Sequence, residues 1–446
     1  MAQDLTTGRP SKAILIYSLP IIIGNFFQQI YNLMDMVIVG RCVDYKALAG
    51  VGATSGLSFF VLWFAMGITS GLGIRIAQFF GAKDFPRLRR SVGTSLVICV
   101  AMTMVLTLLS VAFCRPILEI MGTPADIFDY SYSYILIIFG GLFATIAYNI
   151  ISCILRAIGD SRTPLYFLIF SSLLNVGLDV LFMATFGWGV RGAAWATVGS
   201  QCLSAFLCFV YTWVKYPELR LRRSDFRIER NFVNKHLNIS LPMAFQFSIT
   251  AFGIIILQAA LNGFPSTCIA GFAAASKVQN VGSVVGVSFG VAIANYVGQN
   301  FGAGEVARAR RGVRDTIFMT LGFCLLSSIL ISVFADPFTS IFLDKSTGGD
   351  LSEILWASRQ YLYTSAIFYP FLFCLFVYRN ALQGIGQTFW PLIAGVAELV
   401  LRTAFSMFLP GLLGYRGILL SDVVAWAGAC IVLAISYYRL MPQPRS

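Results

Sequence analysis

Residues 19–41 read LPIIIGNFFQQIYNLMDMVIVGR, an apolar run with a proline, a row of amides and one carboxylate. The apolar envelope, about 13–40, is long enough to cross a bilayer, because roughly 20 helical residues span the hydrocarbon layer. A charged carboxylate is unfavourable in lipid, so Asp35 is expected to face a wet cavity or a polar partner. Gln28 lies two helical turns before Asp35 and shares its face with Asn32. This polar stripe predicts a cavity lining; a hydrogen-bonded seam between helices is the alternative.

The composition is that of a membrane protein. Of the 446 residues, 57% are hydrophobic and 12% are charged, whereas soluble domains average about 25% charged residues. Apolar runs separated by Gly, Pro and charges give about twelve predicted spans. They cover residues 13–40, 47–80, 88–114, 128–155, 163–186, 191–214, 236–262, 267–300, 313–336, 353–382, 388–411 and 416–438. The expected fold class is an all-α polytopic membrane protein of twelve transmembrane helices, with the first span retained rather than cleaved as a signal peptide.

Basic residues collect in alternate loops and account for the net charge of +12. The segment 215–235 is the richest in bases, and the loops of the other side include the acidic stretch 336–353. Loops rich in Lys and Arg remain cytoplasmic, so both termini are expected on the cytoplasmic side of the cell (inner) membrane. Because the bases lie in short loops, membrane lipids and not nucleic acid are their expected surroundings.

The sequence also repeats itself. Gln78-x-Phe80-Gly81-Ala82 recurs as Gln299-x-Phe301-Gly302-Ala303, and Arg87-x-Arg89-Arg90 recurs as Arg308-x-Arg310-Arg311, both 221 residues later. A constant offset over several spans indicates duplication of a six-helix unit, and an even number of spans makes the repeat parallel. We therefore expect an N-terminal lobe (1–214), a basic linker (215–235) and a C-terminal lobe (236–446). Two such pseudo-symmetric lobes suit alternating access better than a channel, since no filter-like loop is visible.

The chain offers little for enzyme or metal chemistry. Its ten cysteines are scattered singly, and His236 is its one histidine. No ligand set for zinc, haem or an iron–sulfur cluster follows from this pattern, and no nucleophile–base pair or phosphate loop supports a membrane enzyme. No cofactor is expected beyond H⁺ or Na⁺ as a coupling ion.

Oxygen-bearing side chains gather at one depth in the first lobe. The topology places Asp35, Asn175, Asp179 and Thr197 at a similar depth on the first, fifth and sixth spans. Asn175 and Asp179 are four residues apart and share a helical face. Two carboxylates with an amide and a hydroxyl suit a small hard cation or a shared proton. The alternative is that Asp35 and Asp179 are each hydrogen-bonded to separate partners and form no common site.

The second lobe breaks this pattern. The repeat sets Leu257 opposite Asp35, Arg402 opposite Asn175, and Asp422 opposite Thr197. Glu398 lies one turn before Arg402, the favourable order for an ion pair. Our hypothesis is that Glu398, Arg402 and Asp422 form an internal ion network, which leaves cation coupling to the first lobe.

Two further bases lie inside predicted spans. Lys277 is too deep to reach the interface easily, so it either pairs with an acid across a cavity or guards the cavity, and both interpretations stay open. Arg75 is close enough to the end of its span to extend into the interface, which favours a structural role.

Several motifs resemble the multidrug and toxic compound extrusion (MATE) transporters over essentially the whole chain. They are Leu19-Pro20 with Asp35-Met36-Val37-Ile38-Val39-Gly40, Ala47-Leu48-Ala49-Gly50-Val51-Gly52, and Leu155-Arg156-Ala157-Ile158-Gly159-Asp160. The resemblance implies an antiporter that exports amphipathic, often cationic small molecules while Na⁺ or H⁺ runs inward.

The resemblance also implies roles for individual residues. Family motifs map onto a kinking Pro20 and onto Asp35, Asn175, Asp179 and Thr197, with Gln28 and Asn149 as further cavity positions. Some members instead use acids on the seventh and tenth helices, but spans 236–262 and 353–382 have no acid in their apolar interiors.

The sequence therefore predicts a rocker-switch cycle in which cation binding bends the first span at Pro20 and Gly24. A monomer is expected. The alternative function is a lipid-linked oligosaccharide flippase of related two-lobe architecture, which is expected to have a more basic central cavity than Lys277 and Arg402 provide.

Overall fold

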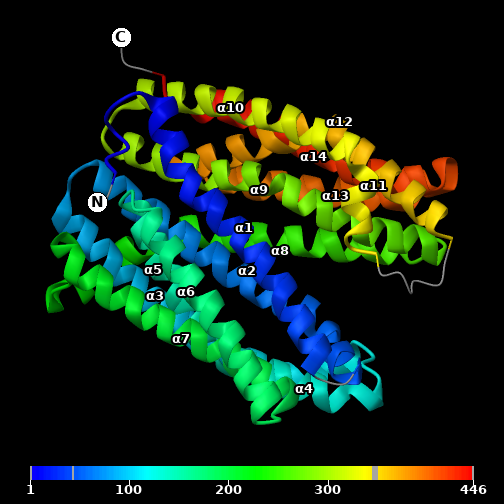
Figure 1. Cartoon of the computed structure of the whole chain (residues 1–446). Coiled ribbons are helices and arrows are strands. Elements are labelled where there is room, and N and C mark those ends of the chain that lie inside the picture. The colour runs from blue at the N-terminus through cyan, green and yellow to red at the C-terminus, as the bar shows by residue number, and fades with distance from the viewer. Residues whose placement is uncertain (1–2, 43–44, 344–349, 444–446) are drawn as a thin grey trace. The chain divides into compact units, whose positions relative to one another are not determined.

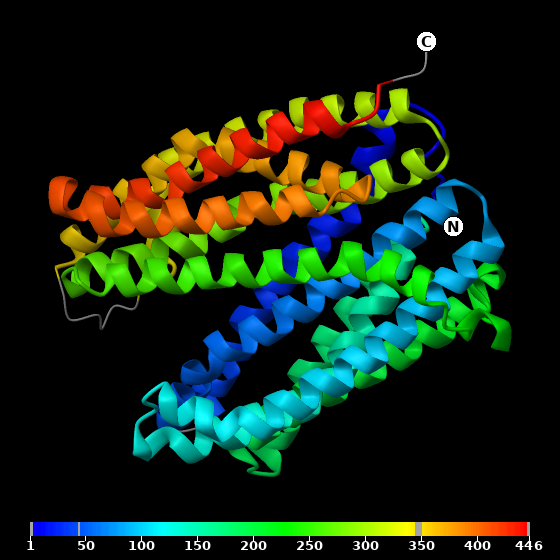
Figure 2. The same ribbon diagram turned by 180° about the vertical axis from the view of Figure 1, so that it is seen from behind.

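The computed structural model describes residues 3–42, 45–343 and 350–443. Within these ranges the chain consists of helices joined by short connections, without strands (Figures 1 and 2). The helices are α1 (Pro10–Cys42), α2 (Tyr45–Gly81), α3 (Phe85–Ile120), α4 (Ala125–Gly140), α5 (Leu142–Ala157), α6 (Arg162–Asp179), the π-helix η1 (Val180–Thr185), α7 (Gly189–Lys215), the 3₁₀ turns η2 (Pro217–Leu219) and η3 (Arg223–Phe226), α8 (Arg230–Leu261), α9 (Ser266–Gly302), α10 (Val306–Val333), α11 (Ala335–Ser340), α12 (Leu351–Gly384), α13 (Phe389–Leu413) and α14 (Tyr415–Leu440).

The sequence repeat reappears in the bounds of the helices. α2 and α9 each contain 37 residues and end at Gly81 and Gly302, the two glycines of the repeated motif. The helices that follow, α3 and α10, begin at Phe85 and Val306, which again lie 221 residues apart. The predicted duplication is therefore also visible in the equal lengths of α2 and α9 and in the constant offset between the starts of α3 and α10.

The described residues contain eleven helices long and apolar enough to cross a membrane, and a twelfth span results if the bent pair α4–α5 is counted as one. This all-α, polytopic architecture confirms the predicted fold class.

The predicted span boundaries differ from the helix ends by a few residues throughout, and three of the differences have a clear cause. The fourth span is broken at Gly140-Gly141, where α4 and α5 meet at 45°. The seventh begins at Arg230 rather than 236, and the ninth at Val306 rather than 313. Polar residues continue both helices beyond their apolar parts, which hydropathy does not detect.

The chain folds into two compact units. Unit 1 comprises Met1–Asp4 and Leu19–Phe247, and unit 2 comprises Leu5–Ser18 and Ser248–Ser446. The first turns of α1 thus pack with unit 2, whereas the first half of α8 packs with unit 1. The lobe boundaries at 214 and 236, which describe the duplication, stay a prediction.

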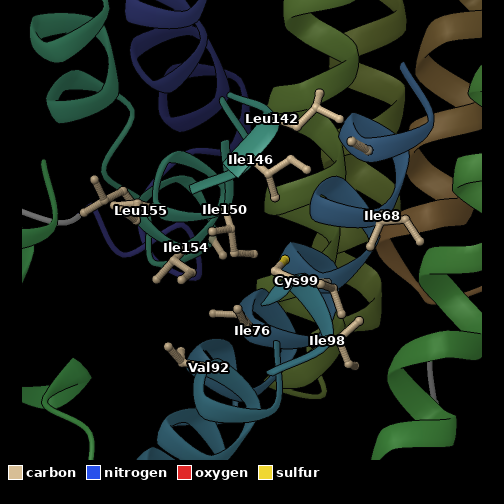
Figure 3. Close-up of a cluster of buried hydrophobic side chains, with 14 of the residues drawn as sticks. Ile68, Ile76, Val92, Ile98, Cys99, Leu142, Ile146, Ile150, Ile154 and Leu155 are labelled. Atoms are coloured by element: carbon tan, nitrogen blue, oxygen red, sulfur yellow. The ribbon is translucent and has the colours of Figure 1, made fainter. Parts of the chain in front are cut away.

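Unit 1 has an apolar core in which α2, α3 and α5 meet. Figure 3 shows isoleucines of all three helices in this cluster, among them Ile76, Ile98 and Ile150. All three are at most 8% exposed. In Figure 1, α5, α6 and α7 run side by side in this unit, so the core supports the helices that carry Asn175, Asp179 and Thr197.

Candidate functional site

Three of the predicted site residues meet inside unit 1. Asn175 and Asp179 of α6 are 1% and 0% exposed, and Thr197 of α7 is half-buried. The side-chain amide of Asn175 is oriented so that both its nitrogen and its oxygen have hydrogen-bond partners. Nδ2 donates to Asp179 Oδ2 (2.9 Å) and to Tyr31 Oη (3.1 Å), and Oδ1 accepts the Thr197 N–H (3.1 Å). The amide also lies 3.4 Å from Thr197 Oγ1. We call Tyr31, Asn175, Asp179 and Thr197 the unit 1 cluster.

The helix geometry places Asp179 at a change of helix type. α6 ends at Asp179 and continues directly as the π-helix η1. A π-helical turn adds a residue to the turn and shifts the side chains that follow, and such turns occur often at functional sites. Four-residue spacing puts Asn175 on the face of Asp179, and α7 supplies Thr197 from the neighbouring helix. The cluster offers oxygen atoms and no guanidinium, which is the chemistry suited to a small cation or a proton.

The first helix contributes Tyr31, which is not among the residues predicted from the sequence. Tyr31 lies one turn before Asp35 in α1, and its hydroxyl reaches Asn175. The side chains of Asp35 and Asn32, both predicted site residues, lie outside the described part of the structure. The signal for Tyr31 is present in the sequence, because it occupies the i−4 position relative to the one carboxylate of the span.

The other first-lobe candidates are placed as follows. Gln28 is half-buried in α1. Asn149 is half-buried in α5, where its Nδ2 donates to Thr145 O in the same helix at 3.0 Å. Pro20 is buried within the continuous helix α1. Gly24, one turn further along, faces α6: a Cβ at this glycine would lie 3.6 and 3.5 Å from the Leu165 and Leu168 side chains.

In unit 2, four buried ionisable side chains contact one another. Arg402 of α13 donates through Nη2 to Glu398 Oε1 and through Nε to Asp422 Oδ1 of α14, both at 2.9 Å. Arg379 of α12 donates through Nη2 to Glu398 Oε2 at 2.9 Å. Each of the four residues is at most 7% exposed. We call these residues the unit 2 quartet; with two cations and two anions its formal charges balance.

Arg379 was missed from the sequence. It lies five residues before the end of α12, where an arginine is ordinarily assumed to extend to the interface. Its partner Glu398 is on another helix, so no spacing rule within one helix indicates the pair.

A glycine makes room for the quartet. A Cβ on Gly253 of α8 would lie 2.2 Å from Arg402 Nη1, far inside van der Waals contact. The guanidinium therefore packs directly against the backbone of α8, and any larger residue at 253 has to displace it.

The two remaining predicted bases lie outside these groups. The exposed Lys277 of α9 places Nζ 5.6 Å from the centre of the Phe342 ring, a cation–π distance. Arg75 of α2 donates through Nη1 to Gln78 Oε1 at 3.2 Å and lies 5.9 Å from the Phe79 ring centre. Both contacts of Arg75 are within the last turns of its own helix, and its structural role stays a prediction.

A third polar group centres on Asp160, which lies just before α6 and outside the candidate spans. Asp160 Oδ2 accepts from the hydroxyls of Tyr216 (2.5 Å) and Thr163 (2.6 Å), and Oδ1 accepts the Thr163 N–H (3.0 Å). Burial by itself raises the pKa of Asp160, but these hydrogen bonds outweigh it and the net pKa is lowered. Burial and the bond to Asp160 raise the pKa of Tyr216. This group caps α6 and ties it to the end of α7.

Comparison with known proteins identifies the family. The MatE family pattern matches residues 20–181 and 242–408, one segment in each half of the chain. The chain belongs to the MatE family. The two matched segments leave out the linker region between them, as expected for a duplicated unit.

MatE relatives align over nearly the full chain. "Probable multidrug resistance protein YpnP" of Bacillus subtilis is 26% identical over 98% of this chain and 97% of its own length. "Probable multidrug resistance protein NorM" of Thermotoga maritima is 24% identical over 93% and 89%, respectively. A solved structure described as the outward-facing conformation of a multidrug resistance MATE family transporter has a TM-score of 0.90, with 24% identity over 98% of this chain and 97% of that one. That likeness establishes the shared fold.

Proposed function

We propose that this MatE protein is a secondary antiporter that exports amphipathic or cationic small molecules in exchange for H⁺ or Na⁺. The observation that carries the proposal is the unit 1 cluster, in which the buried carboxylate of Asp179 accepts from Asn175 beside Thr197. A buried acid in a membrane helix is ordinarily functional. The names of the relatives, which are described as probable multidrug resistance proteins, support drugs as the substrate class.

Asp35 completes the proposed coupling site. It follows Tyr31 by one helical turn in α1, and Tyr31 Oη is bonded to Asn175. Two carboxylates, an amide and a hydroxyl then offer four or more oxygen ligands to Na⁺, or a position where one proton is shared between Asp35 and Asp179. Gln28, Asn32 and Asn149 are proposed to line the substrate cavity.

The conformational response is proposed to begin at Pro20. A proline in a helix removes one backbone hydrogen bond, so a bend there is comparatively easy. Gly24 packs beside Leu165 and Leu168 of α6, the helix that also carries Asn175 and Asp179. Cation binding at the far end of α6 and a bend of α1 at Pro20 are therefore coupled through one helix pair, which suits a rocker-switch cycle.

The unit 2 quartet is proposed to remain ionised throughout this cycle. Its carboxylates already have arginine partners, and an incoming cation would meet two guanidinium groups there. Cation coupling is thus assigned to the first lobe alone. Glu398, Arg402 and Asp422 form an internal ion network that does not bind the coupling cation.

The proposal includes orientation and setting. The distribution of Lys and Arg along the chain supports cytoplasmic termini and a location in the cell membrane. In this proposal the protein acts as a transporter rather than an enzyme, needs no cofactor beyond the coupling ion, and works as a monomer.

Uptake into everted vesicles tests the function. A pH gradient and a Na⁺ gradient are imposed separately, and accumulation of a fluorescent organic cation such as ethidium is followed. Uptake driven by one gradient supports the proposal and identifies the ion. Absence of uptake under both gradients, with movement of a lipid-linked oligosaccharide in a translocation assay, would favour the flippase instead.

A further inference from the structure

The linker between α7 and α8 is held firmly against α3 in unit 1. A Cβ on Gly93 of α3 would lie 2.5 Å from the backbone oxygen of Asp225, so linker and helix are in direct backbone contact. Leu219 is buried at 5% exposure. The linker therefore has one side that faces the protein and another that faces outward.

Two of the linker's acids, the buried Asp225 and the exposed Glu229, are paired with arginines of α3. Asp225 is buried; its Oδ2 accepts the Arg222 N–H at 2.7 Å and lies 3.9 Å from Arg89 Nε of α3. Glu229 is bonded to Arg90 Nη2, also of α3. The arginines that neutralise these acids belong to α3, so the linker's own arginine side chains are not used for the purpose.

The outer side of the linker is consequently basic. The side chains of Arg222, Arg223, Arg227 and Arg230 are all exposed. None of the four takes part in an ion pair found among the described residues. Between them stand two exposed apolar side chains, Phe226 and Ile228, at 44% and 68% exposure. We call these six residues the linker face.

We propose that the linker face is a docking surface for anionic phospholipid headgroups of the adjoining membrane leaflet. Both ends of the linker join membrane-spanning helices, α7 and α8, so its outer side stays close to the headgroup layer. Juxtamembrane clusters of arginine attract anionic lipid. Interleaved apolar side chains such as Phe226 and Ile228 enter the interface beside the headgroups. The positive-inside rule alone accounts for the arginines. It requires neither the pairing of Asp225 and Glu229 with arginines of α3 nor the exposed apolar side chains of Phe226 and Ile228.

This proposal is independent of transport, because its test measures stability. Purified protein in detergent is heated with added dioleoylphosphatidylglycerol or, in parallel, dioleoylphosphatidylcholine at the same mole fraction. A ligand that binds the folded state raises the melting temperature. We expect a larger rise with the anionic lipid, and we expect about 0.5 M NaCl to suppress the difference, because salt screens exposed charges.

Two variants with equal charge loss separate a specific surface from a general charge effect. The first replaces the four arginines of the linker face by glutamine. The second replaces four other exposed bases by glutamine, namely Lys83, Arg87, Arg311 and Arg314. The measured quantity is the rise in melting temperature with dioleoylphosphatidylglycerol beyond the rise with dioleoylphosphatidylcholine. We expect the linker variant to lose more than half of this difference and the control variant to keep most of it. The proposal would be overturned if the linker variant kept the full difference in melting-temperature rise between the two lipids, or if the linker variant and the control variant lost equal parts of it.

A third variant tests the apolar pair. Phe226→Ser with Ile228→Ser keeps every charge but removes the groups that enter the interface. At low salt, we expect the anionic lipid to raise the melting temperature of this variant less than that of the unmodified protein. If the anionic lipid raised the melting temperature of this variant as much as that of the unmodified protein, the headgroups would bind through charge alone. The apolar part of the proposed docking surface would then be wrong.

Discussion

Arg379 Nη2 donates to Glu398 Oε2 at 2.9 Å, from α12 to α13, while the other oxygen of Glu398 accepts from Arg402. Both oxygens of this buried carboxylate are therefore occupied by guanidinium groups of the protein itself. In the unit 1 cluster, by contrast, Asp179 accepts from the neutral amide of Asn175. The two halves of a duplicated chain thus differ in their electrostatics: the quartet pairs its carboxylates with arginines of the protein, whereas the unit 1 cluster contains a carboxylate bonded to a neutral amide.

Asp179→Asn should abolish ion-driven efflux and leave folding intact. The amide oxygen of asparagine can still accept from Asn175 Nδ2, so the hydrogen bond survives while the charge and the titratable proton are lost. We expect at least a tenfold fall in ethidium efflux and a melting temperature close to that of the unmodified protein. Asp35→Asn should behave alike. Efflux retained in either folded variant would remove the coupling role from that carboxylate.

Changes in the quartet should act mainly on stability. Arg379→Met leaves Glu398 with one partner, and removing one member of a buried pair costs about 3–5 kcal/mol. A marked drop in melting temperature is expected, and Arg379→Met combined with Glu398→Gln should cost less than the sum of the single changes. Asp422→Asn or Glu398→Gln protein that is well folded but transports as poorly as Asp179→Asn would contradict the assigned asymmetry.

Gly253→Ala should destabilise unit 2 through a single methyl group. The added Cβ would meet Arg402 Nη1 at 2.2 Å and must displace the guanidinium from its partners. Gly322→Ala in α10 is the matched control, because a Cβ there has no atom within 4 Å and alanine favours a helix by about 0.5–1 kcal/mol over glycine. We expect a lower melting temperature for the first variant and an equal or higher one for the second. A neutral Gly253→Ala would mean that α8 relaxes away from Arg402.

Asp160 should make stability depend on acid pH. Its pKa is lowered in the folded protein, whereas an unfolded aspartate titrates near about 3.9. The stabilisation is therefore complete above that value and is lost as the pH falls toward the lower folded pKa. Asp160→Asn should be less stable than the unmodified protein near neutral pH, and the gap in melting temperature should narrow below about pH 4.

Tyr216→Phe offers an independent check on the same group. It removes the hydroxyl that donates to Asp160 Oδ2 and leaves the carboxylate with its Thr163 contacts. The loss of stability should be smaller than for Asp160→Asn, and the acid transition should move to higher pH because one stabilising donor is gone. An unchanged acid transition would mean that Thr163 alone keeps the pKa of Asp160 low.

Much of the fold was accessible from the sequence. The twelve spans followed from apolar runs, and the duplication from motifs such as Gly81 and Gly302 that end helices of equal length. The grouping of Asn175 with Thr197 followed from counting residues along spans whose direction was predicted from the distribution of Lys and Arg. Where polar residues continue a helix, as at Arg230, hydropathy placed the boundary too late.

Partners across helices were accessible only in part. The Glu398–Arg402 pair lies within one helix and obeys a spacing rule, so it was predicted. Tyr31 and Arg379 were not predicted, because their partners Asn175 and Glu398 lie on other helices.

The amino-acid order by itself determined that this chain spans a membrane, that it is duplicated, and which side chains are too polar to face lipid. Those properties depend on composition and on spacing along one helix. The tertiary structure alone decided which polar groups touch, since the rotation of each helix about its axis and its distance from its neighbours are set by packing across the whole unit. The contact of Gly253 with Arg402 and the inward turn of Asp225 are of this second kind.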